Sequence, residues 1–252
     1  DILEMCSGQR MMTTFFRPGG LWRDVPAEFE LAVRRFLRMM PARIDMYHAL
    51  LTKNPIFMDR TRQIGIINAE EAVRWGLTGP TLRGSGPAID LRKTQPYSGY
   101  EQYDFEVPTG THGDVYDRYL VRMEEMRQSL HIVQQTLDKL PLGPVRTDDR
   151  KYVPPPRAEL GTSMEAVIHH FKHWTEGFQL LKGAVYSPVE SPRGELGVYL
   201  ESDGGTHPHR VHWRTPSFVH LQALPVLARG HLVADLVGII GSVDIVLGDS
   251  DR

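Results

Sequence analysis

Residues 114–140, DVYDRYLVRMEEMRQSLHIVQQTLDKL, carry the clearest structural signal in the chain. Apolar and aromatic side chains recur there at alternating steps of three and four, which places them on one face of an α-helix. The members of this series are Tyr116, Tyr119, Met123, Met126, Leu130, Val133, Leu137 and Leu140. Asp114 is suited to cap the start of the helix, and LPLGP at residues 140–144 ends it. We therefore predict a long helix that packs its apolar face into a core.

Three helical pieces are predicted before this segment. Asp24 can cap a helix whose apolar side chains, from Phe29 to Met40, recur at helical steps. Pro41 is expected to break this helix, because proline lacks a backbone N–H, and a second piece is expected to reach about Leu51. A short helix is predicted over residues 69–75. Residues 76–113 are rich in Gly and Pro, and their cluster of aromatic side chains predicts an ordered, packed loop: Tyr97, Tyr100, Tyr103 and Phe105.

The pattern changes toward the C-terminus. Thr162 and Glu165 have the spacing of a capping box, which predicts a helix after them. Residues 194–202, GELGVYLES, alternate apolar with polar or small side chains, and HRVHWRT at residues 209–215 can return as the second strand of a hairpin. Two short helices are expected at about 218–229 and 232–241. The predicted fold class is mainly α with a small antiparallel β-sheet, that is, α+β.

Composition excludes several classes of function. The 252 residues carry a formal net charge of −2, which does not favour nucleic-acid binding. Cys6 is the one cysteine, so the chain cannot form an internal disulfide or hold an iron–sulfur cluster by itself. The most apolar stretch, residues 232–248, contains Asp235 and Asp244 and is shorter than the roughly 20 residues of a membrane span. A buried core element is the better interpretation.

Two groups of histidines invite comparison with metal sites. His169 and His173 lie one helical turn apart, but a zinc-protease HExxH motif is absent because His170 stands where Glu would be. His207, His209 and His212 form the second group, near the predicted hairpin. Surface or hydrogen-bonded histidines are the favoured interpretation in both cases, so we predict no metal site. Neither a phosphate-binding loop nor a dinucleotide-binding motif is present.

Seven segments together form a specific family pattern. They are GQRMMTTFFRPGG (8–20), RGSGPAIDLRKTQPYSGY (83–100), DRYLVRMEEMRQSL (117–130), TSMEAVIHHFKHWTEGF (162–178), ESPRGELGVYLESDGG (190–205), RTPSFVHLQALP (214–225) and DIVLGDSDR (244–252). These segments resemble the hydrogenase-like large subunit of respiratory complex I. This family comprises the D subunit of bacterial NADH-quinone oxidoreductase and the 49-kilodalton subunit of mitochondria.

The resemblance implies that residues 1–252 are the C-terminal two-thirds of one hydrogenase-like large-subunit domain with a helical bundle core. The N-terminal part of the family domain, with a His-bearing β-hairpin and a Tyr that contact the quinone headgroup, is then missing from this sequence. The implied function is that of a quinone-chamber subunit in a proton-pumping NADH:quinone oxidoreductase. The implied location is peripheral, on the cytoplasmic face of the bacterial cell membrane.

The resemblance also implies the partners and cofactors. A small partner subunit holds the terminal [4Fe–4S] cluster, quinone binds at the interface, and FMN and NADH bind other subunits. This chain alone would bind no cofactor, carry no catalytic residue and be inactive in isolation. It would contact the membrane arm through partners.

Two residues near the C-terminus are the expected quinone-site residues. The large subunits of related hydrogenases end in D-P-C-x-x-C-x-x-H, and the two cysteine thiolates of this motif bind metal. In this chain Asp244 matches the Asp of the motif. Val246 and Asp249 replace the two cysteines, and Arg252 replaces the His. In the complex I family the positions of Asp244 and Val246 are associated with the quinone and inhibitor site. Ile245 departs from the family's Pro.

Three residues near the N-terminus are expected close to the partner's cluster. The family carries R-x-H where this chain has Arg10 and Met12, and Arg17 also matches a family arginine. A methionine thioether cannot donate the hydrogen bond that the family's His gives to the cluster. The departure at Met12 therefore predicts a lower cluster potential.

Two alternatives to this function remain at the level of sequence. One is a non-catalytic scaffold subunit of a related hydrogenase-like or ferredoxin-fed membrane complex, because the electron donor docks on other subunits. The other, weakly supported, is a histidine-based metallohydrolase.

Overall fold

The computed structural model describes residues 1–251, which divide into two compact units. The first unit contains residues Asp1–Arg38, Lys139–Ala184 and Leu200–Arg210. The second contains Met39–Asp138, Val185–Tyr199 and the chain from Val211 onward. Helix α2 (Phe29–Tyr47) and strands β3 (Gly183–Ser191), β4 (Gly194–Ser202) and β5 (Arg210–Arg214) each contribute residues to both units.

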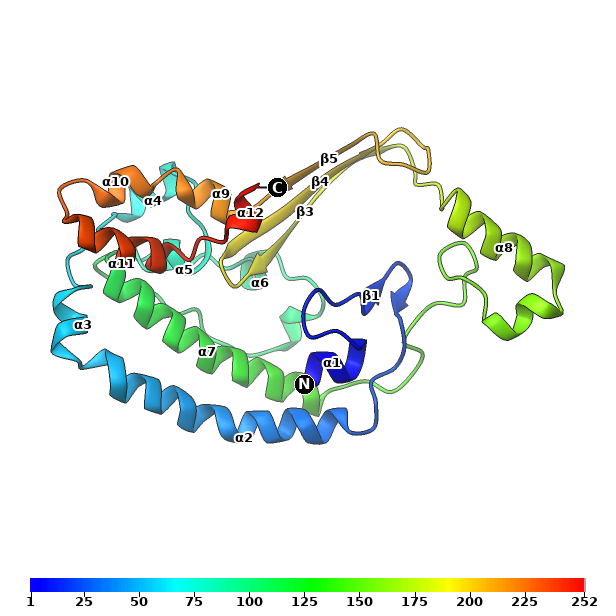
Figure 1. The fold of residues 1–252 in the computed structure, drawn as a ribbon, viewed down its shortest axis with the longest axis horizontal. Coiled ribbons are helices and arrows are strands. Elements are labelled where there is room, and N and C mark those ends of the chain that lie inside the picture. Colours follow the sequence, from blue (N-terminus) through cyan, green and yellow to red (C-terminus); the bar gives the residue numbers. More distant parts are fainter. Residues whose placement is uncertain (252) are drawn as a thin grey trace. The chain divides into compact units, whose positions relative to one another are not determined.

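The second unit is built on α7 (Val115–Asp138), the predicted long helix (Figure 1). Asp114 caps it as predicted, because its Oδ1 accepts the backbone N–H of Asp117 at 2.7 Å. Helices α5 (Gly79–Arg83) and α11 (Val233–Val243) pack against α7. Buried apolar side chains from these three helices, from α4 (Ala69–Arg74) and α10 (Leu224–Ala228) and from the connecting loops form the core: Ile64, Ile67, Ala72, Leu77, Leu82, Val115, Ala223, Leu227, Ile239 and Val243.

Short helices complete this unit around the core. Asn68 caps α4 (Ala69–Arg74), which agrees with the helix predicted there. The remaining elements are α3 (Pro55–Asp59), α6 (Leu91–Thr94), α9 (Pro216–Leu221), α10 (Leu224–Ala228), α12 (Leu247–Asp251), a π-helical turn (His48–Thr52) and a 3-10 turn (Tyr100–Gln102). The aromatic loop is ordered as predicted, since Tyr100 makes edge contacts with Tyr97, Tyr103 and Phe105.

The predicted break of α2 at Pro41 is wrong. The helix continues through Pro41 to Tyr47 and passes directly into the π-helical turn. Proline inside a helix costs about 3 kcal/mol. Val33 and Ile44, on either side of it, are buried, and their burial offsets part of that cost.

The first unit contains α1 (Ile2–Ser7), a two-stranded hairpin of β1 (Phe16–Arg17) and β2 (Gly20–Leu21), a 3-10 turn (Arg157–Gly161) and α8 (Met164–Thr175). Gly20 has a φ of 138° and pairs with Arg146, and a Cβ there would collide with the Val145 carbonyl. Glycine therefore lets the 143–157 segment approach the hairpin.

The predicted capping box at Thr162 is also wrong. Ser163 caps α8, because its Oγ accepts the N–H of Ala166 at 3.2 Å. The Thr162 hydroxyl instead donates to the Glu159 carbonyl in the preceding turn. The apolar face of α8 is exposed, with Met164, Phe171 and Trp174 each more than 60% accessible.

The larger sheet has three strands in the order β3-β4-β5. Strands β4 and β5 match the predicted hairpin, whereas β3 pairs with the other side of β4 and was not predicted. The fold is mainly α with small antiparallel sheets, as predicted. No helix in the described residues is both long and apolar enough to serve as a membrane span.

Candidate functional site

Asp244 occupies a sharp turn at the end of α11. Its φ is 58° and its backbone N–H donates to Ile240 O at 3.1 Å, which closes the helix with a left-handed residue. The carboxylate Oδ2 lies 3.6 Å from Nε of Arg193, which is in the β3–β4 turn. Asp244 exposes 39% of its side chain, so a ligand can reach it.

Val246 follows two residues later and is fixed through its backbone. Its N–H donates to Ser217 Oγ at 3.3 Å, and the N–H of Ser217 donates to Asp249 Oδ2 at 3.1 Å. These bonds join the C-terminal segment to the start of α9. Asp249, which the resemblance matches to a hydrogenase cysteine, thus has a structural partner in this chain. Arg252 lies outside the described residues.

Arg122 on α7 presents a buried guanidinium to the same region. Its Nη1 donates to Arg118 O at 3.2 Å, while Nε and Nη2 are buried and have no hydrogen-bond partner in the part of the chain that the structure describes. Burial lowers the pKa of Arg122, and the carboxylates of Asp244 and Glu125 oppose that shift. Neither Arg122 nor Arg193 was identified from the sequence. The one available signal was the spacing of Arg118, Arg122 and Glu125, which puts three charged residues on one helical face.

A buried ionic cluster lies nearby around Arg83, which is almost fully buried. Its Nη2 is 2.6 Å from Glu125 Oε1, and its Nη1 is 2.8 Å from Glu190 Oε1. Arg92 binds Asp90 through two hydrogen bonds, at 2.6 and 3.0 Å. Burial raises the pKa of Asp90, but Arg92 and Arg83 more than reverse the shift, so its pKa is below the usual value. Burial raises the pKa of Glu125, against the opposing effect of Arg83. Glu125 and Arg83 of this cluster act electrostatically on Arg122, as Asp244 does.

His220 on α9 is a fully buried imidazole in the same unit. Its Nε2 accepts the backbone N–H of Thr78 at 3.1 Å, so the ring proton is on Nδ1, which has no partner among the described residues. Burial, followed by the positive charges of Arg214 and Arg122, lowers the pKa of His220 to about 4. The ring is therefore neutral at physiological pH.

The three expected cluster-side residues lie in the first unit but have different surroundings. Arg10 Nε is 3.4 Å from Glu4 Oε1. Met12 is 85% exposed and has a φ of 54°, unusual for a residue other than glycine. Arg17 stacks on Trp22, with its guanidinium carbon 5.4 Å from the ring centre.

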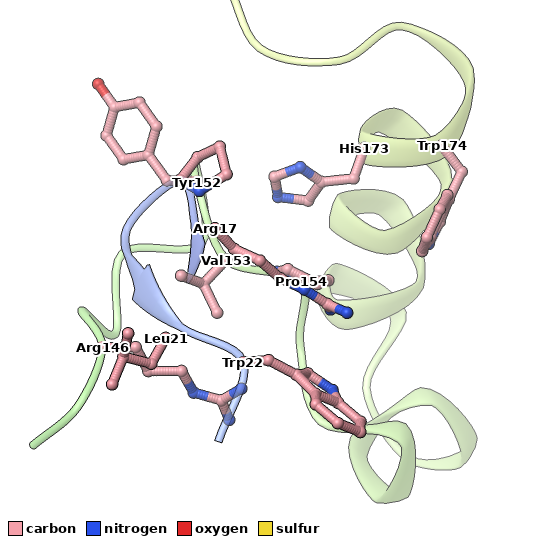
Figure 2. Close-up of a pocket in the computed structure, with 10 residues that line it drawn as sticks. Arg17, Leu21, Trp22, Arg146, Tyr152, Val153, Pro154, His173 and Trp174 are labelled. Carbon is pink, nitrogen blue, oxygen red and sulfur yellow. The ribbon is translucent and has the colours of Figure 1, made fainter. Parts of the chain in front are cut away.

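Arg17 alone of these three lines a cavity of about 350 Å³. Figure 2 shows Arg17 extending toward α8 and His173 pointing from α8 toward the β1–β2 hairpin. Trp22, Arg146 and Trp174 also line this cavity. Two guanidiniums, an imidazole and two indoles suit an acidic or aromatic group.

The histidine groups do not assemble a metal site in residues 1–251, where no three His, Cys, Asp or Glu side chains gather suitably. His173 Nε2 lies 2.7 Å from the Arg150 carbonyl, and His169 Nε2 lies 3.8 Å from Glu165 Oε1. His173 thus has a hydrogen-bond partner, whereas the contact of His169 is longer than a hydrogen bond.

Comparison with known proteins identifies similar sequences over the whole chain. Residues 1–252 match the family described as "Respiratory-chain NADH dehydrogenase, 49 Kd subunit". The chain is 60% identical to the second D subunit of the NADH-quinone oxidoreductase of Roseiflexus sp. (strain RS-1), covering 100% of this chain and 61% of that protein. It is 54% identical to the corresponding D subunit of Thermus thermophilus, covering 100% and 62% respectively. The chain thus spans about three-fifths of the length of these relatives.

Proposed function

Because the chain belongs to the family of the 49-kilodalton subunit of the respiratory-chain NADH dehydrogenase, we propose that it forms part of the quinone chamber of a proton-pumping NADH:quinone oxidoreductase. In this proposal a small partner subunit holds the terminal [4Fe–4S] cluster, and FMN and NADH bind other subunits. Two electrons reach the quinone through that cluster, and two protons complete its reduction to quinol. The reduction energy drives proton translocation in the membrane arm. The assembly holds the chain peripherally on the cytoplasmic face of the cell membrane.

The observation that carries this proposal is the corner formed by Asp244, Val246 and Arg193. An apolar side chain and a paired but accessible carboxylate lie within three residues of each other. A quinone needs both kinds of contact, since its ring is apolar and its carbonyl oxygens are polar. The names of the relatives favour a quinone reductase over the scaffold alternative. No observation favours a metallohydrolase.

The test is Val246→Phe in the complete complex. The larger side chain is expected to narrow the chamber, so the KM for a short-chain quinone and the affinity for a quinone-site inhibitor change together. NADH:ferricyanide activity, which bypasses the quinone, reports intact upstream electron transfer and assembly. Val237→Phe is the matched control, because Val237 is an exposed valine on α11 outside this corner. Unchanged quinone kinetics and inhibitor affinity in Val246→Phe would contradict the site assignment.

A further inference from the structure

Three buried guanidinium nitrogens around Asp244 have no hydrogen-bond partner among the described residues. They are Nε and Nη2 of Arg122 and Nε of Arg193. Both arginines interact electrostatically with Asp244, and Arg122 is close enough to Arg193 for their charges to repel. Helix α7 therefore brings two donors without a hydrogen-bond partner toward Asp244, and the β3–β4 turn brings a third nitrogen, Nε of Arg193, which faces the carboxylate at 3.6 Å, beyond hydrogen-bond distance.

The other buried arginines of this unit make a clear contrast. Arg118, one turn before Arg122 on α7, donates from Nε, Nη1 and Nη2 to three acceptors at 2.8–3.0 Å. Arg83 pairs with Glu125 and Glu190. A buried donor without an acceptor is destabilising, and an arginine retained for the fold alone is expected to be paired as Arg118 is. The donors of Arg122 thus indicate an acceptor outside the described residues.

We propose that Arg122 and Arg193 bind a carbonyl oxygen of the quinone at the Asp244–Val246 corner. This inference rests on the proposed function. A quinone carbonyl accepts hydrogen bonds without carrying a full charge, so Asp244 can stay beside it and offset part of the charge of the two guanidiniums. Negative charge grows on that oxygen as electrons arrive, and charge-assisted hydrogen bonds strengthen with it. The guanidiniums remain protonated throughout, so the two protons of the quinol come from elsewhere.

The experiment uses the complete complex with Arg122→Gln, Arg122→Lys and Arg193→Gln. The substrate is decylubiquinone or its naphthoquinone counterpart, whichever the wild-type complex reduces. Removing a charge-assisted donor is expected to raise the quinone KM about tenfold or more and to lower kcat. Lysine at position 122 is expected to restore part of the loss, because it keeps the charge but not the planar, two-donor geometry.

Controls separate this role from a structural one. NADH:ferricyanide activity is expected to remain at the wild-type level in each variant. Arg127→Gln is the matched control, since Arg127 lies on α7 but pairs with Asp45 at the surface, and its quinone KM is expected to be unchanged. Arg193 is in a turn and one-third exposed, so Arg193→Gln tests the proposal even if the α7 variants fail to assemble.

The outcomes also separate this proposal from the proposed function. In one outcome, Val246→Phe changes the quinone KM, while Arg193→Gln and any assembled Arg122 variant leave it at the wild-type value. In that case the assignment of Arg122 and Arg193 to quinone binding is wrong, and the assignment of the quinone chamber stands. If Val246→Phe and the arginine variants all leave quinone kinetics unchanged, both assignments are wrong.

Discussion

Arg118 Nε donates to Ser242 Oγ at 3.0 Å and thereby joins α7 to α11 inside the second unit. The other two arms of the same guanidinium donate to the carbonyls of Gly113 and Gly65. Burial lowers the pKa of Arg118 to about 10, so the group is charged at neutral pH. One side chain thus satisfies three acceptors from separate segments of the chain.

Arg118→Met is expected to destabilise the second unit by about 3–5 kcal/mol, because it leaves buried acceptors without donors. Hydrogen exchange of α7 and α11 amides, measured by mass spectrometry in the assembled complex, checks this. Arg127→Met removes a surface arginine from the same helix and is expected to exchange like wild type. Equal protection in the two variants would show that the three hydrogen bonds contribute little.

Gly113→Ala is expected to reduce assembly of the complex sharply. Gly113 has a φ of 69°, and an added Cβ would collide with the Ile67 carbonyl, which is fixed in the backbone. Gly161→Ala is the control, because nothing lies within 4 Å of a Cβ there and its φ is not in the left-handed range. The yield of purified complex is the measurement. Normal yield of the Gly113 variant would mean that the loop before α7 adapts easily.

His220 is expected to make the stability of the second unit depend on pH. Its folded pKa of about 4 is below the ordinary value of 6.5, so the unfolded state binds the proton first. Stability is complete above pH 6.5 and falls as pH decreases toward 4, with a loss of about 2 kcal/mol at pH 5. Exchange protection around Thr78, corrected for intrinsic rates, is expected to fall between pH 7.5 and 5 in wild type. His220→Gln removes the titrating ring, so the persistence of the full pH effect in that variant would assign it to other groups.

Met12→His is expected to raise the midpoint potential of the partner's cluster in the proposed assembly. An imidazole N–H can donate to a cluster sulfur, which stabilises the more negative reduced form. The substitution suits the backbone, since His tolerates the left-handed region better than most residues. Redox titration of the intact enzyme is the measurement, with Met11→His as the control because Met11 is also exposed. An unchanged midpoint in Met12→His would overturn the hypothesis.

Local sequence patterns predicted the elements in which apolar residues recur at a regular spacing. Helix α7, with its apolar residues at steps of three and four, and strand β4, with its alternating residues, are of this kind. Strand β3 escaped prediction because its residues are largely exposed and show no clean alternation. Helix α12 is a single short segment of mostly polar residues, with little periodicity to detect.

Some residues of the candidate site could likewise be predicted from the sequence, and others could not. Asp244 and Val246 were identified by family resemblance, because their positions in the C-terminal motif match those of the family. Arg193 and Arg122 were not, because an isolated arginine in a turn or on a helix usually faces solvent. Arg83 and Glu190 are 107 positions apart, so their pairing depends on how the sheet and helices meet rather than on local sequence.

The left-handed backbone at Asp244 narrows what this position can become. Few side chains other than Gly, Asn and Asp hold such a conformation cheaply, and among these three only Asp carries a negative charge at neutral pH. Glutamate would keep the charge but is less suited to the turn, and asparagine would keep the turn but lose the charge. The backbone conformation and the charge requirement therefore both restrict which residues position 244 tolerates. Aspartate can for this reason persist at position 244 even where neighbouring residues of the site have been replaced.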